Sequence, residues 1–240
     1  MKLSGVIKGV QKLLYKKYCA AVIVAAGSAS RMGGIDKVMA PLGGEPMILR
    51  TVRAFQQCDA IREIVIVTRQ DLLVAIMDLC HDFSKVKTVV AGGNTRVESV
   101  ELGLAAVSAK TQLVAIHDGA RPLVSAEVIE NTVAKGEAFG AAAPGIPLKD
   151  TVKEVSGGLV TNTPDRDALR AIQTPQVFDL DLLKGALAKV KKEKLQITDD
   201  CSAVEKLGMS VRIVPGEERN MKITTPMDLK VAELLLEEEV

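Results

Sequence analysis

Aromatic residues are almost absent from this 240-residue chain: they make up 2% of the sequence, and tryptophan does not occur. A buried core must therefore consist mainly of valine, isoleucine, leucine and alanine, in a chain that is 48% apolar. Strands made of such residues are typical of a parallel sheet covered by helices on both faces. The high apolar content excludes disorder over the whole chain, and the length allows one large domain or two small ones.

An excess of charge of one sign is also lacking. The 31 lysines and arginines nearly balance 30 acidic residues, for a net charge of +1, so there is no general basic field that would attract nucleic acid. No stretch approaches the roughly 20 apolar residues of a membrane span. We therefore expect neither nucleic acid nor a membrane among the partners.

Cysteine is scarce, and the spacing of the cysteines does not match a metal-binding motif. The four cysteines form no C-x-x-C pair, and only two histidines accompany them. A zinc site or a disulfide framework is therefore disfavoured. We expect reduced, buried thiols and a cytoplasmic protein.

Residues 1–18 form a basic, mildly amphipathic segment without the apolar stretch of a signal peptide. We expect a short N-terminal extension there, followed by one domain over residues 19–240, because no linker long enough to divide this region occurs.

Short apolar runs bounded by turn residues alternate with segments of helical periodicity. The runs predict buried strands at Ala20–Ala26, Ile61–Thr68, Val86–Ala91, Leu113–His117 and Phe139–Pro144. The intervening segments predict helices at Pro46–Gln57, Asp71–Cys80, Arg96–Val107 and Ser125–Ala138, the last with Ser125 as N-cap. This alternation indicates an α/β fold with a mainly parallel sheet, whose ligand site lies beyond the carboxyl ends of the strands.

The pattern changes after Pro144. Residues of about 147–163 predict two short strands joined at Gly157-Gly158, which is a hairpin signal, and we expect them to project as a β-arm that docks on a partner subunit. Beyond the arm, the sequence predicts a Pro-rich loop with Thr174-Pro175-Gln176, a helix near Asp179–Val190, a strand near Val211–Val214 and a last helix from Met227.

A polar, glycine-rich loop follows the first predicted strand. Its glycines allow close approach of backbone N–H groups to an anion, and Arg31 and Lys37 supply positive charge, so the pattern indicates a triphosphate site. It matches neither the Walker motif, because Gly34 rather than lysine follows Gly33, nor the dinucleotide fingerprint, because Ala29 replaces a required glycine. An ordinary glycine turn with solvated charges is the alternative.

Asp118 stands at the end of the fourth predicted strand, in the segment HDGARP. A carboxylate at this edge is suited to Mg²⁺, which prefers oxygen ligands and substrate phosphates. A turn or helix cap is the structural alternative. The segments around Arg166, Thr174 and Lys222 are candidate site loops, although each is also compatible with a solvated loop.

Taken in order, several motifs resemble those of the 2-C-methyl-D-erythritol 4-phosphate cytidylyltransferase family. They are AAGSASRMG, the following Lys37, GGNTRVESV, HDGARP, Pro147–Thr151, TPDR, TPQ, TDD and NMKIT, and together they cover about residues 19 to 238. The resemblance implies a single-domain, Rossmann-like nucleotidyltransferase fold and a homodimer whose β-arms reach the neighbouring subunit. It also implies the reaction of CTP with the sugar-alcohol phosphate, which releases pyrophosphate.

The same resemblance assigns roles to individual residues. Arg31, Lys37 and Lys222 would act on the phosphates, with Arg31 and Lys37 stabilising the transition state, and Asp118 would lie close to Mg²⁺ and the substrate hydroxyls. The cytidine pocket would be lined by Ala26, Gly27, Gly93, Asn94 and Ser99. The methylerythritol phosphate would be held by Arg166, Thr174 and, from the partner's arm, Thr151, with assistance from Arg121.

This chain differs from the family pattern at two positions. Asn94 stands where many relatives have aspartate, but its carbonyl oxygen can still accept a hydrogen bond from the cytosine amino group. Ala29 stands where some relatives have glycine.

Two other functions remain open at this level: cytidylyl transfer to ribitol 5-phosphate, and a non-catalytic nucleotide-binding regulator. The combination of Arg31, Lys37, Asp118 and Lys222 disfavours the regulator, because a binding module needs no metal site beside the α-phosphate. The failed dinucleotide fingerprint disfavours a hydride-transferring enzyme.

Overall fold

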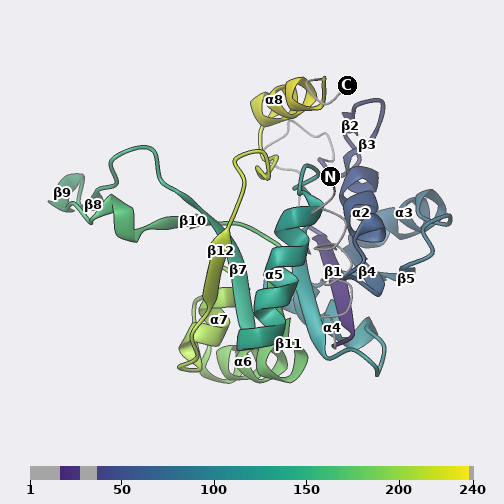
Figure 1. Cartoon of the computed structure of the whole chain (residues 1–240), viewed down its shortest axis with the longest axis horizontal. Coiled ribbons are helices and arrows are strands. Elements are labelled where there is room, and N and C mark those ends of the chain that lie inside the picture. The colour runs from purple at the N-terminus through teal and green to yellow at the C-terminus, as the bar shows by residue number, and fades with distance from the viewer. Residues whose placement is uncertain (1–16, 28–36, 238–240) are drawn as a thin grey trace, which may run out of the picture.

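The aliphatic runs of the sequence form the centre of an eight-stranded sheet in the computed structural model, which describes residues 17–27 and 37–237 (Figure 1). The order of the strands along the sheet is β10-β7-β11-β6-β1-β4-β5, and β12 also pairs with β7. Their bounds are β1 Cys19–Ala25, β4 Glu63–Thr68, β5 Val86–Ala91, β6 Leu113–Asp118, β7 Ala141–Pro147, β10 Arg170–Ile172, β11 Gln176–Asp179 and β12 Arg212–Pro215.

The sheet is mixed and mostly parallel, which confirms the predicted fold class. Strand β1 lies between β4 and β6 and runs parallel to both, so that Ile23 pairs with Ile66 on one side and with His117 on the other. Strand β11 runs antiparallel between β6 and β7, and β10 adds antiparallel to β7. The prediction of a Pro-rich loop around Pro175 was therefore wrong in part, because short strands on both sides of the proline complete the sheet.

Helices cover both faces of the sheet (Figure 1). Helices α2 (Met47–Gln57), α3 (Leu73–Leu79) and α5 (Ala126–Phe139) contribute to one core. Helices α4 (Arg96–Ala106), α6 (Leu180–Glu193) and α7 (Asp200–Lys206) contribute to the core on the opposite face. The helix predicted at Asp71–Cys80 is correct from Leu73, but a 3₁₀ turn at Gln70–Leu72 precedes it.

Alternation along the strands separates these two cores. In β1, Ile23 packs in the core with α2 and α5, whereas Val22 packs in the core with α4 and α6. Ile66 and Val67 of β4 divide in the same way. Because successive side chains of a strand point to opposite faces, one continuous apolar run serves both layers.

Local signals fix the ends of several helices. The Ser125 hydroxyl accepts a hydrogen bond from the Val128 N–H, which confirms the predicted N-cap of α5, and Gly140 ends that helix with φ of 82°. Helix α7 was not predicted. Its start is a capping box of Asp199 and Ser202, in which each side chain accepts from the other residue's backbone N–H.

The predicted hairpin is present and projects from the body of the molecule (Figure 1). Strands β8 (Glu154–Ser156) and β9 (Leu159–Asn162) pair antiparallel and are exposed along their whole length. Gly157 and Gly158 have φ of 58° and 82°, which glycine adopts without steric cost and which a two-residue hairpin turn requires. A 3₁₀ turn at Arg166–Ala168 lies at the base of the arm, just before β10.

A smaller group of elements lies beside the sheet. Strands β2 (Pro41–Leu42) and β3 (Glu45–Pro46) form a short hairpin, and α8 (Pro226–Glu237) packs beside β2. Leu42 and Ile223 belong to the apolar cluster that joins them.

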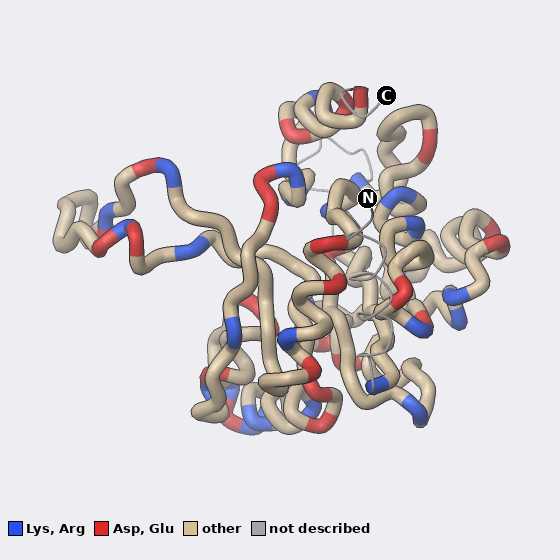
Figure 2. The backbone as a smooth tube through the Cα atoms, viewed as in Figure 1, with Lys and Arg blue, Asp and Glu red and all other residues tan. Residues whose placement is uncertain are grey.

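The four cysteines are buried and free, as the sequence predicted. Figure 2 shows acidic and basic residues interspersed along the chain, in keeping with the small net charge. Across residues 17–27 and 37–237, no helix is both long enough and apolar enough to cross a membrane.

Candidate functional site

A cavity of about 390 Å³ lies where β1 and β6 end, and segments distant in the sequence meet around it. It has the location that a mainly parallel sheet favours for ligands. The lining residues are Val24, Ala25, Ala26, Gly27, Lys37, Val38, Gly93, Asn94, Thr95, Arg96, Ser99, Asp118, Ala120 and Lys222.

Most of the predicted site residues lie in this cavity. It brings together Ala26, Gly27, Lys37, Gly93, Asn94, Ser99, Asp118 and Lys222. Arg31 and most of the glycine-rich loop lie outside the described residues. The cavity wall therefore unites the predicted nucleoside-binding residues with two of the three predicted cations.

Asp118 is the ionic centre of the cavity. Its Oδ2 atom lies 3.0 Å from Nζ of Lys222 and 3.3 Å from Nε of Arg121. Burial acts to raise the pKa of Asp118, but the positive charges of Lys222, Arg96 and Arg121 outweigh it and lower the pKa to about 2. The carboxylate is therefore ionised at neutral pH.

Arg121 connects this carboxylate to the loop that carries Lys222. Its Nη1 donates to the backbone carbonyl of Asn220 at 2.7 Å. The buried Asn220 side chain in turn donates to the carbonyl of Thr174 at 2.9 Å and to Oε1 of Gln173 at 3.2 Å. Arg121 thus helps to fix Lys222 beside Asp118 within one chain, and its predicted contact with the second substrate stays a prediction.

Thr174 and His117 support Asp118 from behind. The Thr174 hydroxyl lies 3.0 Å from Nδ1 of His117 and accepts a hydrogen bond from the Asp118 N–H at 3.1 Å. Burial lowers the pKa of His117 to about 4, so the ring is neutral at pH 7. Its Nε2 lies 3.2 Å from the carbonyl of Arg121 and must donate to it, which leaves Nδ1 to accept from Thr174. Thr174 is buried here, so its predicted substrate contact is also untested.

The turn between β5 and α4 forms another part of the lining and is held by its own hydrogen bonds. The Gly93 N–H donates to Oγ of Ser99 at 3.1 Å, and that hydroxyl donates to the carbonyl of Thr95 at 3.0 Å. The Asn94 N–H donates to a carboxylate oxygen of Glu98 at 2.8 Å. Ser99 therefore holds the backbone that lines the cavity, and the Asn94 side chain belongs to that lining.

Arg96 is a cavity residue to which the sequence analysis gave no role. Its Nη2 lies 2.7 Å from Oδ2 of Asp200, whose side chain is fully buried. Burial raises the pKa of Asp200, and the charge of Arg96 opposes this effect. Both residues belong to motifs noted above, GGNTRVESV and TDD. The motifs marked the two segments as candidate site segments, but the sequence did not indicate that they contact each other.

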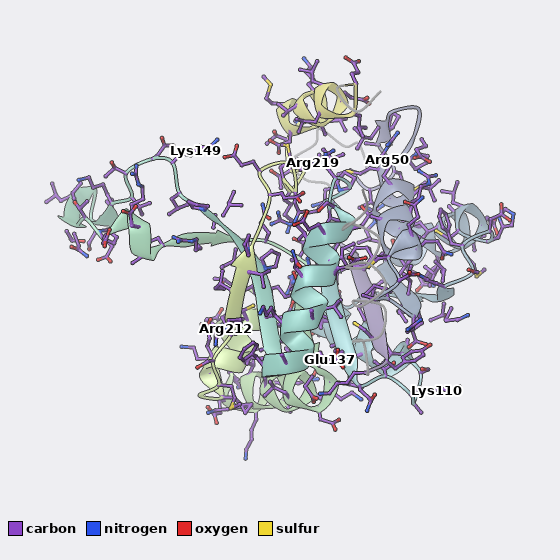
Figure 3. All side chains as sticks on the ribbon, in the orientation of Figure 1. Arg50, Lys110, Glu137, Lys149, Arg212 and Arg219 are labelled. Atoms are coloured by element: carbon purple, nitrogen blue, oxygen red, sulfur yellow. The ribbon has the colours of Figure 1, made fainter. Side chains whose placement is uncertain are left out.

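Of the five predicted substrate residues, Asp118 lines the cavity, Arg121 and Thr174 contact Asp118, and Thr151 and Arg166 belong to the arm and its base. Thr151 is exposed on the arm, and Arg166 lies at the base of the arm, where its Nη1 donates to the carbonyl of Lys149 at 2.8 Å. Figure 3 shows Lys149 on the arm, away from the sheet.

The described residues contain no cluster of three or more histidines, cysteines, aspartates or glutamates that could hold a metal alone. Among the described residues that line the cavity, the carboxylate is that of Asp118. This donor does not fit a metal that needs an all-protein cage, but it fits Mg²⁺, which binds through one or two carboxylates together with substrate phosphates and water.

Comparisons with known proteins agree with this geometry. Residues 19–238 match the sequence family of 2-C-methyl-D-erythritol 4-phosphate cytidylyltransferase. A protein of that name from Symbiobacterium thermophilum is 43% identical over 220 residues, which is 91% of this chain and 92% of the relative. Another, from Dehalococcoides mccartyi, is 44% identical over 219 residues, covering 90% and 95% of the two chains.

Solved structures show the same fold. The 4-diphosphocytidyl-2C-methyl-D-erythritol synthase of Anaerococcus prevotii superimposes with a TM-score of 0.85 at 32% identity, over 92% of this chain and 99% of that one. The 2-C-methyl-D-erythritol 4-phosphate cytidylyltransferase of Thermus thermophilus gives a TM-score of 0.75 at 31% identity, over 90% and 98%.

Proposed function

Because this chain belongs to the 2-C-methyl-D-erythritol 4-phosphate cytidylyltransferase family, we propose that the cavity around Lys37, Asp118 and Lys222 is the site of its reaction. The enzyme transfers the cytidylyl group of CTP to 2-C-methyl-D-erythritol 4-phosphate in isoprenoid biosynthesis. The observation that carries the site assignment is the convergence of two lysines and an ionised carboxylate on one nucleotide-sized cavity.

The chemistry matches the residues present. A phosphate oxygen of the second substrate attacks the α-phosphorus of CTP, the bond from that phosphorus to the bridging oxygen breaks, and pyrophosphate leaves. The nucleophile is already ionised at neutral pH, so no strong general base is required. The barrier comes from bringing two anions together, and Lys37, Lys222 and Arg31 lower it by positioning and by stabilising negative charge.

Lys222 and Asp118 act together in this proposal. The carboxylate holds the lysine ammonium at a defined place in the cavity before substrate arrives. The fixed charge therefore needs little reorganisation when charge develops on the phosphoryl oxygens, which is the condition for electrostatic catalysis.

Asp118 is also the residue that would hold Mg²⁺. When held by this carboxylate, the ion would neutralise charge on the phosphates of CTP. Lys222 and Arg121 occupy the neighbourhood of Oδ2 and so orient the carboxylate for this role.

The turn between β5 and α4 serves the nucleoside. Gly93 and Asn94 line the cavity, as do Ala26 and Gly27, which directly follow β1. In the proposed complex the Asn94 side-chain oxygen accepts a hydrogen bond from the cytosine amino group. Ser99 maintains the turn that presents Asn94.

The second substrate and the dimer depend on the arm. We place Thr151 in the site of the partner subunit, with Arg166, Thr174 and Arg121 assigned to the methylerythritol phosphate. The arm exposes the apolar side chains Val155, Leu159 and Val160, which are 60%, 73% and 60% exposed. Apolar side chains gathered on a projecting hairpin support a homodimer interface.

A cytoplasmic location completes the proposal. It is supported by the four free, buried cysteines, which suit a reducing compartment.

Pyrophosphate release tests the proposed activity. We expect release with CTP and 2-C-methyl-D-erythritol 4-phosphate in the presence of Mg²⁺, and much slower release with ribitol 5-phosphate or with other nucleoside triphosphates. Equal turnover of the two polyol phosphates would contradict the substrate assignment. Binding of CTP without any release would instead indicate a nucleotide-binding regulator.

A further inference from the structure

Arg96 lines the cavity together with the turn between β5 and α4 and with Asp118. It is the first residue of α4, directly after the turn that carries Asn94, and its charge contributes to the low pKa of Asp118. Its side chain is 31% exposed and lines the cavity, whereas Asp200, its ion-pair partner, is 0% exposed. The guanidinium is therefore anchored on the protein side and open on the cavity side.

Asp200 is itself held firmly. Oε1 of Gln176 in β11 accepts from the backbone N–H groups of both Asp200 and Cys201, each at 3.1 Å. Burial of a carboxylate charge is unfavourable in free energy unless a cation compensates it. Arg96 forms the ion pair with Asp200.

We propose that Asp200 is a positioning residue for CTP: it holds the Arg96 guanidinium so that the remaining N–H groups donate to the ribose and α-phosphate oxygens of the nucleotide. This inference rests on the proposed function of the cavity and extends it to a residue pair outside that assignment. A guanidinium has five N–H donors in a rigid fork, so a contact to Asp200 leaves several for a ligand.

The placement explains why the nucleotide, rather than the second substrate, is the ligand. Asn94, Thr95 and Ser99, which are near Arg96 in the sequence, line the part of the cavity assigned to the nucleoside, and Asp118 of the same lining feels the charge of Arg96. The middle of a bound nucleotide would lie between this part and Asp118. Fixing Arg96 before binding reduces the loss of side-chain entropy when CTP enters.

The alternative is that the Arg96–Asp200 pair is purely structural and only connects α4 to α7. The two roles differ in kinetics. Loss of a structural contact lowers the stability of the protein without a selective effect on one substrate. Loss of a positioned hydrogen-bond donor instead raises the KM for CTP and leaves the KM for methylerythritol phosphate unchanged.

The test compares Asp200→Asn, Arg96→Gln, the double variant and Ser202→Ala. Ser202→Ala is the matched control, because it removes a capping hydrogen bond of α7, whereas Gln176 still holds the Asp200 backbone and Asp200 keeps its contact to Arg96. We expect Asp200→Asn and Arg96→Gln each to raise the KM and the calorimetric Kd for CTP roughly tenfold, the size of one hydrogen bond to a charged group. Ser202→Ala should lower Tm but leave both values unchanged.

The double variant provides the decisive comparison. If Asp200 acts through Arg96, the double variant binds CTP within about twofold of Arg96→Gln alone, because coupled residues are not additive. Additive losses would overturn the proposal, as would equal effects of Asp200→Asn and Ser202→Ala on CTP binding. Should Asp200→Asn fail to fold, Arg96→Lys decides: an unchanged Kd for CTP overturns the need for a fixed fork, and a raised one supports it.

Failure of the proposed function gives a different pattern. If Lys37→Ala and Arg96→Gln both leave CTP binding and turnover intact, the cavity is not the nucleotide site. If only Lys37→Ala abolishes turnover while Arg96→Gln has no effect on CTP, the cavity assignment stands and the role of the Arg96–Asp200 pair falls.

Discussion

The Asp118 carboxylate lies 3.0 Å from the Lys222 ammonium, although one residue ends β6 and the other precedes α8. Arg121 makes the second contact to the same oxygen and also holds the loop before Lys222 through the Asn220 carbonyl. The carboxylate and both cations thus form one network, and removal of the Asp118 charge should also disturb the positions of Lys222 and Arg121.

Asp118→Asn is therefore expected to lower kcat on the order of 10²-fold, the size of losing one preorganised electrostatic contact. The amide keeps the shape but loses the charge that holds Lys222 and would hold Mg²⁺. Turnover measured against Mg²⁺ concentration should also show a higher half-saturating concentration. A variant with normal kcat and normal Mg²⁺ dependence would remove Asp118 from the mechanism.

Lys37→Ala should fold normally and lose cytidylyl transfer by about 10²–10³-fold. Lys37 lines the cavity, so truncation removes a charge from the proposed phosphate site. Lys110→Ala serves as control, because Lys110 is an exposed lysine shortly before the start of β6, at the end of that strand opposite to Asp118 and the cavity; Figure 3 labels it at the lower right. Circular dichroism and Tm should be unchanged in both variants, and near-normal turnover in Lys37→Ala would contradict the assignment.

His117 makes stability depend on pH. Burial lowers its folded-state pKa to about 4 from the ordinary histidine value of 6.5, so the unfolded chain binds a proton at higher pH than the folded one. The stabilising contribution is complete above pH 6.5 and is lost as pH falls toward 4. Between pH 7 and 4.5 this group alone should cost about 2–3 kcal/mol of unfolding free energy.

Urea unfolding without nucleotide or metal measures this effect. His117→Gln should be less stable at pH 7, because it alters the contacts to Thr174 and Arg121. Its loss of stability on acidification should be smaller than that of the unaltered protein. Identical pH profiles of the two proteins would show that His117 does not remain neutral when buried.

Gly103 is expected to tolerate no side chain. A Cβ on this α4 residue would lie 2.4 Å from Cγ1 of Val22 and 2.8 Å from Cγ2 of Val67. Gly103→Ala should therefore lower stability by about 1–3 kcal/mol, despite the gain in helix propensity. Gly185→Ala in α6, where nothing lies within 4 Å, should instead raise stability by about 0.5–1 kcal/mol. Thermal unfolding of both variants distinguishes packing from propensity.

The sequence predicted the repetitive part of the fold well. Buried runs such as Leu113–His117 were recognisable because both faces of the strand need apolar residues, and Ser125 marked its helix through its cap. Strand β11 and helix α7 were missed. They are short, four and seven residues, and are fixed by long-range contacts such as Gln176 to Asp199 and Asp200, which no local pattern reveals.

The site was predictable where a residue follows a strand directly. Asp118 and Gly93 could be located by the rule that ligands lie beyond strand ends. The role of Thr174 behind Asp118 and the pairing of Arg96 with Asp200 depend on contacts between distant segments. Motif order marked these segments as important without indicating which residue of each meets which.

The shared site makes a last prediction, because Thr151 and Lys37 lie on different parts of one chain. Thr151 is exposed on the arm, whereas Lys37 lines the cavity. If the arm completes the neighbour's site, Thr151→Ala and Lys37→Ala homodimers are each impaired, but a hybrid dimer contains one site with both residues intact. Random mixing should then restore up to about a quarter of the unaltered activity in a two-fold symmetric dimer.

The control is a mixture of Lys37→Ala with the Lys37→Ala/Thr151→Ala double variant, in which every site lacks Lys37. This mixture should stay inactive under the same unfolding and refolding procedure. Restoration in the first mixture alone requires residues of two chains in one site, since neither variant contains a complete site of its own. Without restoration in confirmed hybrid dimers, Thr151 must act within its own chain or not at all, and the arm would serve dimer formation only.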